Sequence, residues 1–313
     1  MANGQWFPPD WPERIRALAD GTLEPVVPKR AATVMLLRDA GAAQGAQDSP
    51  QTPQARCSGD GPDALGGPLV HMLRRRASMA FAGGAYAYPG GGVDPRDDDR
   101  HVGWAGPTRA WWAKRLGVDE AGAQAIVCAA VRETFEEAGV LLAGPTADSV
   151  VGDTTGDEWE ADRAALVARE LSFAEFLERR GLVLRSDLLG AWTRWITPEF
   201  EARRYDTWFF VAALPRGQRT RNVSTEADRT VWIRPAEAAA AYDRGELLMM
   251  PPTIATLRQL TPYASAEQAL AAAPGRDLTP VLARARLADG EIVLSWPGHD
   301  EFTKHIPTGG APA

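Results

Sequence analysis

Apolar residues gather along this chain in short runs of strand length and in longer stretches with a helical period. The runs that predict buried strands cover residues 33–39, 69–76, 188–198, 205–214 and 231–235. We expect the first two to pair as a hairpin, because a single connecting segment separates them. That segment, 40–67, is rich in Gly, Ala, Gln, Pro and Ser, and we predict a flexible surface insertion.

The longest stretch with a helical period has a defined start and end. Asp119 is a predicted N-cap, the helix covers residues 120–138, and Gly139 ends it. A hairpin is predicted over 280–298, around an Asp-Gly pair. Further helices are predicted at 160–180, 235–244 and 252–260. This mixture predicts an α/β or α+β domain with one main core.

Composition narrows the protein class. Of 313 residues, 45% are hydrophobic and 24% charged, as in soluble globular proteins. The net charge of −7 argues against a nucleic-acid or membrane surface. No apolar run has the length of a membrane span, and from the two ends of this sequence we expect neither a signal peptide nor a peroxisomal SKL address. Cys57 and Cys128 lie in no metal-binding pattern, so the expected compartment is a reducing cytoplasm.

One face of the predicted helix 120–138 is acidic. The apolar residues of its second half fall on one side, and Glu133, Glu136 and Glu137 gather on the other. Like charges at these spacings repel by about 0.2–0.5 kcal/mol per pair, and Arg132 offsets part of this. Carboxylate oxygens on one rigid face suit Mg²⁺ or Mn²⁺. A solvated acidic face is the alternative interpretation.

The string RETFEEAGV at 132–140 specifies an arginine, a helix-ending glycine and a following apolar residue in addition to the glutamates. It resembles the second half of the Nudix box, G-x5-E-x7-R-E-U-x-E-E-x-G-U with U a bulky aliphatic, although Thr134 replaces one aliphatic. Upstream, Gly91 and Asp97 reproduce the opening G-x5-E with Asp for Glu. Residues 98–131 number 34 where the motif has seven, an excess of 27. The box is therefore interrupted, by an insertion assigned to 98–123, and a loop-to-helix junction tolerates this.

An interrupted box resembles the Nudix subgroup that includes the mammalian peroxisomal coenzyme A diphosphatase. The strings LRRRASMAFAGGAYAYPGG, WITPEFEARRYDTWFFVAALP and STEADRTVWIRPAEA are similar to elements of that subgroup. A coenzyme A signature ending G-x3-F-P-G-G fits residues 84–91 with Tyr88 for Phe, and it is partial because Ala80 replaces its arginine. The resemblance runs from Ala31 to Leu260.

The resemblance implies a Nudix-type α/β/α sandwich with a mixed sheet, helical insertions and a C-terminal hairpin. It divides the chain into an N-terminal extension (1–30), a Nudix domain (31–262) and a C-terminal extension (263–313). It also implies hydrolysis of a nucleoside diphosphate derivative with Mg²⁺ or Mn²⁺ as cofactor. Coenzyme A or acyl-coenzyme A is the favoured substrate, and ADP-ribose or NADH is a close rival. A Nudix-fold nucleotide sensor without catalysis is the other alternative.

The resemblance also implies roles for the acidic residues. Glu136 and Glu137 are expected metal ligands, and Glu133 is a further ligand or the general base. Arg132 is expected to orient Glu133 rather than contact substrate. The carbonyl of Gly90 is expected to supply another metal oxygen. One more catalytic acid is sought outside the box, and Glu226 is the candidate, with an ordinary loop glutamate as an equal alternative.

The three consecutive glycines at 90–92 predict a turn, and substrate contacts are expected from this glycine turn and from arginines. Gly91 is a candidate for close approach to the substrate. Arg74 and Arg75 suit phosphate geometry but alternate faces on a strand, so a solvated strand end is the alternative for each. Arg204 is a further candidate. The expected partner is a small-molecule nucleotide, and the C-terminal hairpin is a candidate homodimer contact.

Overall fold

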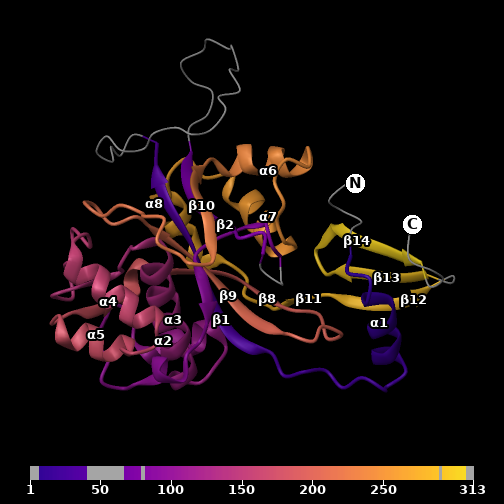
Figure 1. Cartoon of the computed structure of the whole chain (residues 1–313), viewed down its shortest axis with the longest axis horizontal. Coiled ribbons are helices and arrows are strands. Elements are labelled where there is room, and N and C mark those ends of the chain that lie inside the picture. The colour runs from indigo at the N-terminus through magenta and orange to yellow at the C-terminus, as the bar shows by residue number, and fades with distance from the viewer. Residues whose placement is uncertain (1–6, 41–66, 79–81, 289–290, 308–313) are drawn as a thin grey trace, which may run out of the picture.

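The computed structural model describes residues 7–40, 67–78, 82–288 and 291–307, so most of the predicted insertion 40–67 lies outside the described residues. A mixed sheet occupies the centre of the molecule (Figure 1). In spatial order its strands are β10 (Ala227–Ile233), β2 (Pro68–Arg75), β1 (Lys29–Asp39), β9 (Tyr205–Ala213), β8 (Gly190–Ile196) and β11 (Val281–Leu282). The short strands β3 (Tyr86–Ala87) and β4 (Gly90–Gly92) pair with β2 and β1, respectively.

The register of β1 fixes the middle of the sheet. β1 runs parallel to β9, with Val34 opposite Phe210, and antiparallel to β2, with Leu37 opposite Val70. The predicted hairpin of the first two strands is therefore confirmed. The glycines predicted as a turn are instead largely a strand, because Gly90 to Gly92 pair with β1.

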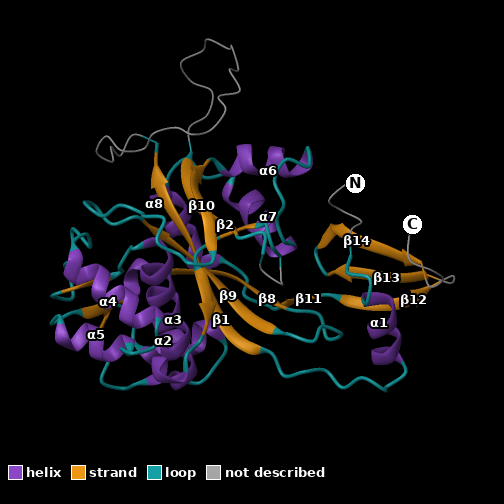
Figure 2. Ribbon diagram, viewed as in Figure 1, coloured by secondary structure: helices purple, strands orange, loops and turns teal. Residues whose placement is uncertain are grey.

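Helices cover both faces of the sheet (Figure 2). They are α2 (Arg109–Leu116), α3 (Glu120–Ala138), α4 (Asp157–Val167), α5 (Phe173–Arg179), α6 (Pro235–Asp243), α7 (Pro251–Leu260) and α8 (Ala266–Ala272). A further helix, α1 (Trp11–Ala19), lies beside the C-terminal strands instead (Figure 1). Alternate residues of β1 enter different cores, as the period of two in a strand requires. Val34 and Leu36 pack with α3, and Met35 and Leu37 pack with α6 to α8. This layering confirms the α/β/α sandwich.

Two small sheets flank the sandwich. One comprises β5 (Trp104–Ala105), β7 (Val183–Arg185) and β6 (Ala143–Gly144). The other comprises β12 (Arg284–Ala288), β13 (Glu291–Trp296) and β14 (His299–Pro307), and β12 and β13 form the predicted C-terminal hairpin. The turn at 289–290 lies outside the described residues. The third strand, β14, was not predicted.

The prediction of one helix over 160–180 is wrong, because the structure has two. α4 ends at Val167, and Arg169 adopts a left-handed backbone with φ of 60°. A new helix then starts at a capping box, in which Ser172 and Glu175 each accept a hydrogen bond from the other's backbone N–H. The S-x-x-E string was present in the sequence and signals this start.

The packing of α3 against the core predicts how much stability is lost when one of its buried side chains is removed. Phe135 is fully buried, and its ring centroid lies 5.2 Å from that of Phe176. We expect Phe135→Ala to lower the free energy of unfolding by about 3–5 kcal/mol in urea titrations, because it leaves a cavity. Val167→Ala is the control, since Val167 is exposed and should change stability by less than about 0.5 kcal/mol. Similar losses for both variants would contradict this packing.

Candidate active site

α3 presents its acidic face from a firmly capped helix. The Asp119 side chain accepts a hydrogen bond from the N–H of Gly122 at 2.9 Å, and Gly139 ends the helix with φ of 69°. Both predicted helix ends are confirmed. Glu133, Glu136 and Glu137 lie on the side of α3 that faces away from the core, as predicted from the helical wheel.

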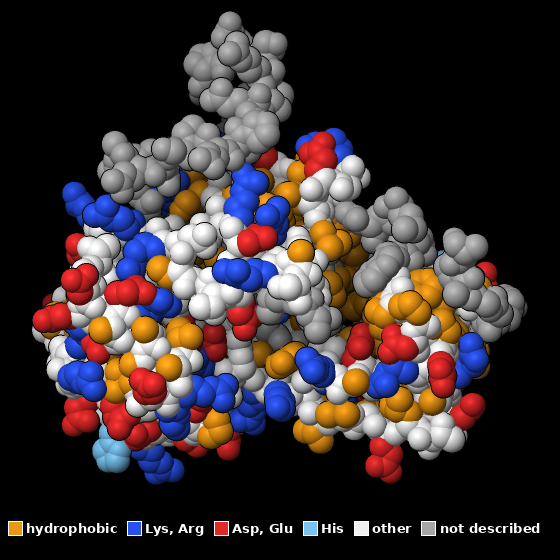
Figure 3. Space-filling view, viewed as in Figure 1, with side chains coloured by type: hydrophobic (Ala, Val, Ile, Leu, Met, Phe, Trp, Pro, Cys, Tyr) orange, Lys and Arg blue, Asp and Glu red, His pale blue; other side chains and the backbone are white. Residues whose placement is uncertain are grey.

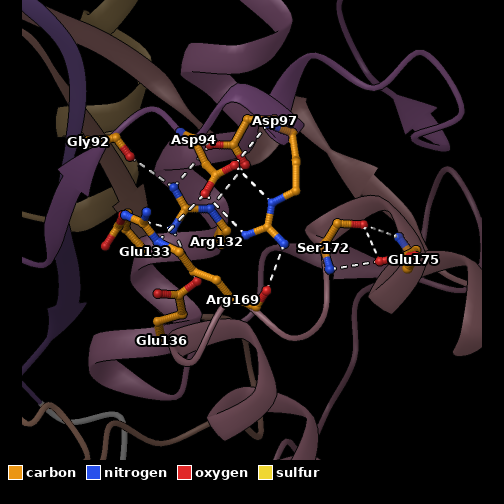
Figure 4. Close-up of polar contacts among 10 residues, drawn as sticks. Gly92, Asp94, Asp97, Arg132, Glu133, Glu136, Arg169, Ser172 and Glu175 are labelled. Carbon is orange, nitrogen blue, oxygen red and sulfur yellow. Dashed lines mark hydrogen bonds and ion pairs between the residues drawn. The ribbon is translucent and has the colours of Figure 1, made fainter.

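Arg132 lies at the centre of the cluster in Figure 4. Its Nε and Nη2 donate to the two carboxylate oxygens of Asp97, each at 3.0 Å. Its Nη1 donates to Glu133 Oε1 at 2.8 Å and to Glu136 Oε1 at 3.1 Å. Nη2 also donates to the carbonyl of Gly92 at 3.0 Å. The guanidinium therefore joins the two halves of the interrupted motif.

Asp97 occupies its position through a local turn. Residues Pro95–Asp98 form a 3-10 helix whose N-cap is Asp94, and the backbone N–H of Asp94 donates to Asp97 Oδ2 at 2.8 Å. Asp97 is buried, and Figure 4 shows Asp94 and Asp97 on the side of Arg132 opposite the α3 acids. The shorter aspartate thus reaches the arginine from this turn. The Asp-for-Glu change preserves the ion pair.

The glycine strand β4 lies against the acids. A Cβ added to Gly91 would stand 2.6 Å from the carboxylate carbon of Glu133, so no other residue fits without moving Glu133. The N–H of Gly90 donates to Glu137 Oε2 at 2.8 Å. The observed contact of Gly90 with the cluster is therefore through its N–H, and metal binding by its carbonyl stays a prediction.

A second group of polar side chains lies beside Glu137, on strands and loops outside α3. Arg75, Ser224 and Glu226 line with it a small pocket of about 20 Å³. Ser224 Oγ lies 3.4 Å from Glu137 Oε1, and Arg75 Nη2 lies 3.8 Å from Glu226 Oε2. Within the described part of the chain, the buried Nε of Arg75 has no hydrogen-bond partner. Ser224 was missed by sequence analysis, although it lies two residues before Glu226 in the STE string.

Two predicted substrate residues lie outside this group. Arg74 Nε donates to Asp228 Oδ1 at 2.7 Å on the strand surface. Arg204 is buried and donates to the carbonyls of Val26 at 2.7 Å and Thr197 at 3.1 Å. These contacts attach the chain before β1 to the β8–β9 connection. Arg204 is thus occupied by structural contacts, and the structure does not bring it to the acidic cluster.

Known proteins share sequence similarity with this chain. The family model described as the NUDT19 Nudix domain matches residues 112–260. The chain is 28% identical over 232 residues to a Gallus gallus protein named acyl-coenzyme A diphosphatase NUDT19, covering 62% of this chain and 61% of that protein. The Homo sapiens protein of that name is 28% identical over 273 residues, covering 76% of this chain and 69% of the relative. The chain is therefore similar to the Nudix family over residues 112–260, just under half of its length.

A solved structure supports the Nudix fold separately. A NUDIX hydrolase from Alicyclobacillus acidocaldarius superposes with a TM-score of 0.59 at 24% identity, covering 79% of this chain and 96% of that one. The likeness extends the fold assignment to strands before residue 112. None of the helices in the described ranges is long and apolar enough to cross a membrane. On the face shown in Figure 3, positive and negative side chains are interspersed.

The carboxylates of the acidic face of α3 have raised pKa values. Burial raises the pKa of the Glu137 carboxyl to about 8, and the charge of Glu133 adds to this. Burial raises the pKa of Glu133 to about 7, although Arg132 opposes the rise. The pKa of Glu136 is also raised, mainly by burial. Such values mark carboxylates that a nearby cation would stabilise.

The donor set fits Mg²⁺ or Mn²⁺ in kind, since it consists of carboxylate oxygens. Among the described residues, no three His, Cys, Asp or Glu side chains are arranged as a complete metal cage. Arg132 pairs with Glu133 and Glu136, whereas Glu137 turns toward Gly90. A full cage is not required, because Mg²⁺ commonly binds one or two carboxylates together with waters and substrate phosphates.

The Asp97–Arg132 pair predicts a large effect on stability. We expect Asp97→Ala to lower the free energy of unfolding by about 3 kcal/mol, because it removes the main counter-charge of a buried arginine. Urea titration measures this. Asp98→Ala is the matched control, since its neighbour Asp98 is exposed. An Asp97→Ala loss no larger than that of the control would contradict the pairing.

The raised pKa values predict how metal binding depends on pH. Carboxylates must lose their protons to bind a cation, and those of Glu133 and Glu137 do so near pH 7 and 8. Affinity for Mn²⁺, measured by calorimetry without substrate, should therefore rise from pH 6 to pH 8.5. Proton release on binding should be greatest at the acidic end of that range. An affinity unchanged across the range would show that these carboxyls do not titrate on metal binding.

Proposed function

We propose that this protein is a Mg²⁺- or Mn²⁺-dependent Nudix hydrolase that cleaves the diphosphate of coenzyme A or acyl-coenzyme A. The observation that carries the proposal is the acidic face of α3, placed against a strand of three glycines and braced by Arg132 and Asp97. The chicken and human relatives are named acyl-coenzyme A diphosphatases, and this supplies the substrate class. A bound metal ion would neutralise phosphate charge and activate water.

The contacts of each residue on the acidic face of α3 indicate its role in the proposed reaction. Arg132 already donates to five acceptor atoms on four residues, so it orients carboxylates and is not available to substrate. Glu136 and Glu137 supply metal oxygens in this proposal. Glu133 is the further ligand or the general base, and its pKa near 7 suits proton transfer at neutral pH. The missing side chain of Gly91 leaves Glu133 room to act.

The small pocket beside Glu137 supplies the substrate side. In this proposal Arg75 binds a phosphate oxygen, because its side chain is 29% exposed and its contact to Glu226 is long, at 3.8 Å. The side chain of Glu226 is 57% exposed, and it lines the same pocket as Glu137. It is the proposed additional acid.

Two other functions remain in competition. ADP-ribose or NADH shares the nucleoside diphosphate and would use the same metal site. A sensor that binds a nucleotide without catalysis is disfavoured, because the three glutamates and the Asp97–Arg132 pair are all present. A homodimer and a cytoplasmic location stay predictions.

A panel of substrates tests the proposal. The protein is incubated with Mg²⁺ or Mn²⁺ and coenzyme A, acyl-coenzyme A, NADH, ADP-ribose, dinucleoside polyphosphates or nucleoside triphosphates, and products are identified by mass. Coenzyme A should give adenosine 3′,5′-bisphosphate and phosphopantetheine. Glu137→Gln, as the matched control, should fold and lose activity. Turnover of none of these compounds, with metal-independent nucleotide binding, would favour the sensor.

Arg74 and Arg75 form a matched pair for the substrate side. Arg75→Ala should raise KM for the preferred substrate about tenfold or more, because it removes a charge-assisted contact to phosphate. Arg74→Ala should change KM less than about twofold, since Arg74 pairs with Asp228 away from the pocket. Steady-state kinetics at saturating metal measures both. Equal effects of the two variants would rule out a specific role for Arg75.

A further inference from the structure

The last turn of α3 depends on distant segments for its backbone hydrogen bonds. This turn carries Glu136 and Glu137, contains no basic residue, and ends a helix whose final carbonyls have no helical partners. Arg163 Nη1, from α4, donates to the carbonyl of Glu136 at 2.8 Å. The backbone N–H of Arg221, from the β9–β10 connection, donates to the carbonyl of Ala138 at 2.9 Å.

Glu160 joins these two arginines. Arg163 Nε donates to both carboxylate oxygens of Glu160, each at 3.0 Å, and Nη2 adds a further contact. Arg221 Nη1 donates to Glu160 Oε2 at 3.1 Å. Arg163 is buried, whereas Glu160 is partly exposed. The Glu160 carboxylate thus binds both guanidinium groups. We call these three residues, Glu160, Arg163 and Arg221, the α3 clamp.

The end of the helix is shaped for the clamp. A Cβ on Gly139 would stand 2.7 Å from Arg221 Nε, so the residue that ends α3 also leaves room for Arg221. Thr154 reinforces the junction, because its hydroxyl donates to the carbonyl of Gly139 at 2.6 Å and its carbonyl accepts from Arg221 Nη2 at 3.2 Å. Cations at this end of a helix are favoured by its dipole.

We propose that the α3 clamp consists of positioning residues for the metal site, which set the orientation of Glu136 and Glu137 through the helix backbone. This inference rests on the proposed function. Glu136 is fixed at its side chain by Arg132 and at its carbonyl by Arg163. Without Arg163 the last turn loses a backbone contact and frays, so its carboxylates bind metal less well. Outer contacts of this kind change metal affinity by about 10- to 100-fold.

Arg163→Met tests the proposal, because methionine keeps the apolar stem and removes every donor. Mn²⁺ binding to the full chain is measured without substrate, from the electron paramagnetic resonance signal of free Mn²⁺. We expect affinity to fall about tenfold. The Mg²⁺ concentration that gives half-maximal activity should rise in parallel, and kcat at saturating Mg²⁺ should change little. Arg179→Met is the matched control, since Arg179 is exposed and pairs from α5 with Asp162 of α4.

The outcomes separate the inference from the proposed function. Mn²⁺ binding by Arg163→Met as tight as that of the unmodified chain would overturn the clamp, whatever the change in stability. If Arg163→Met does not fold, Glu160→Gln replaces it, with an expected loss of affinity of several-fold, and unchanged affinity would overturn the clamp equally. Absence of Mn²⁺ binding by the unmodified chain would overturn the metal assignment of the proposed function, and the inference with it.

Discussion

The ion pair between Arg132 and Asp97 is the interaction on which the rest of the site depends. A buried guanidinium cannot lose its proton, so the fold must supply counter-charge and acceptors for it. Asp97 supplies two oxygens across 35 positions of sequence, and Glu133, Glu136 and the carbonyl of Gly92 supply the remainder. Three segments are thereby joined: the glycine strand, the 3-10 turn and the acidic helix.

This constraint explains how the motif survives a long interruption. The insertion returns to α3 after adding β5, α2 and extra helical turns, and the two halves still meet at Arg132. Gln124, which stands where an uninterrupted box would carry its glutamate, instead donates to the carbonyl of Asp99 at 2.6 Å. The chain between Asp97 and Arg132 is therefore longer than in an uninterrupted box, and the contacts around Arg132 still form.

Local signals made much of this structure predictable. The caps at Asp119 and Gly139 gave both ends of α3, and apolar runs gave the main strands, because these features depend on neighbouring residues. The direction in which individual arginine side chains point was harder to predict from the sequence. Arg74 and Arg75 differ only in strand face, and the partner strand β10 decides which one meets Glu137. Arg204 is occupied by the carbonyl of Val26, 178 positions away, which no local pattern reveals.

The acidic face of α3 is supported from both sides, by Arg132 at its side chains and by distant segments at its last carbonyls. A helix so constrained can keep these carboxyl groups close together until a cation binds. The most direct test is a crystal of the protein soaked in Mn²⁺, with the ion located by its anomalous scattering. The account predicts a peak coordinated by Glu137 and at least one other carboxylate of α3. A fully exchanged crystal with no peak on this face, or with its peak elsewhere, would contradict it.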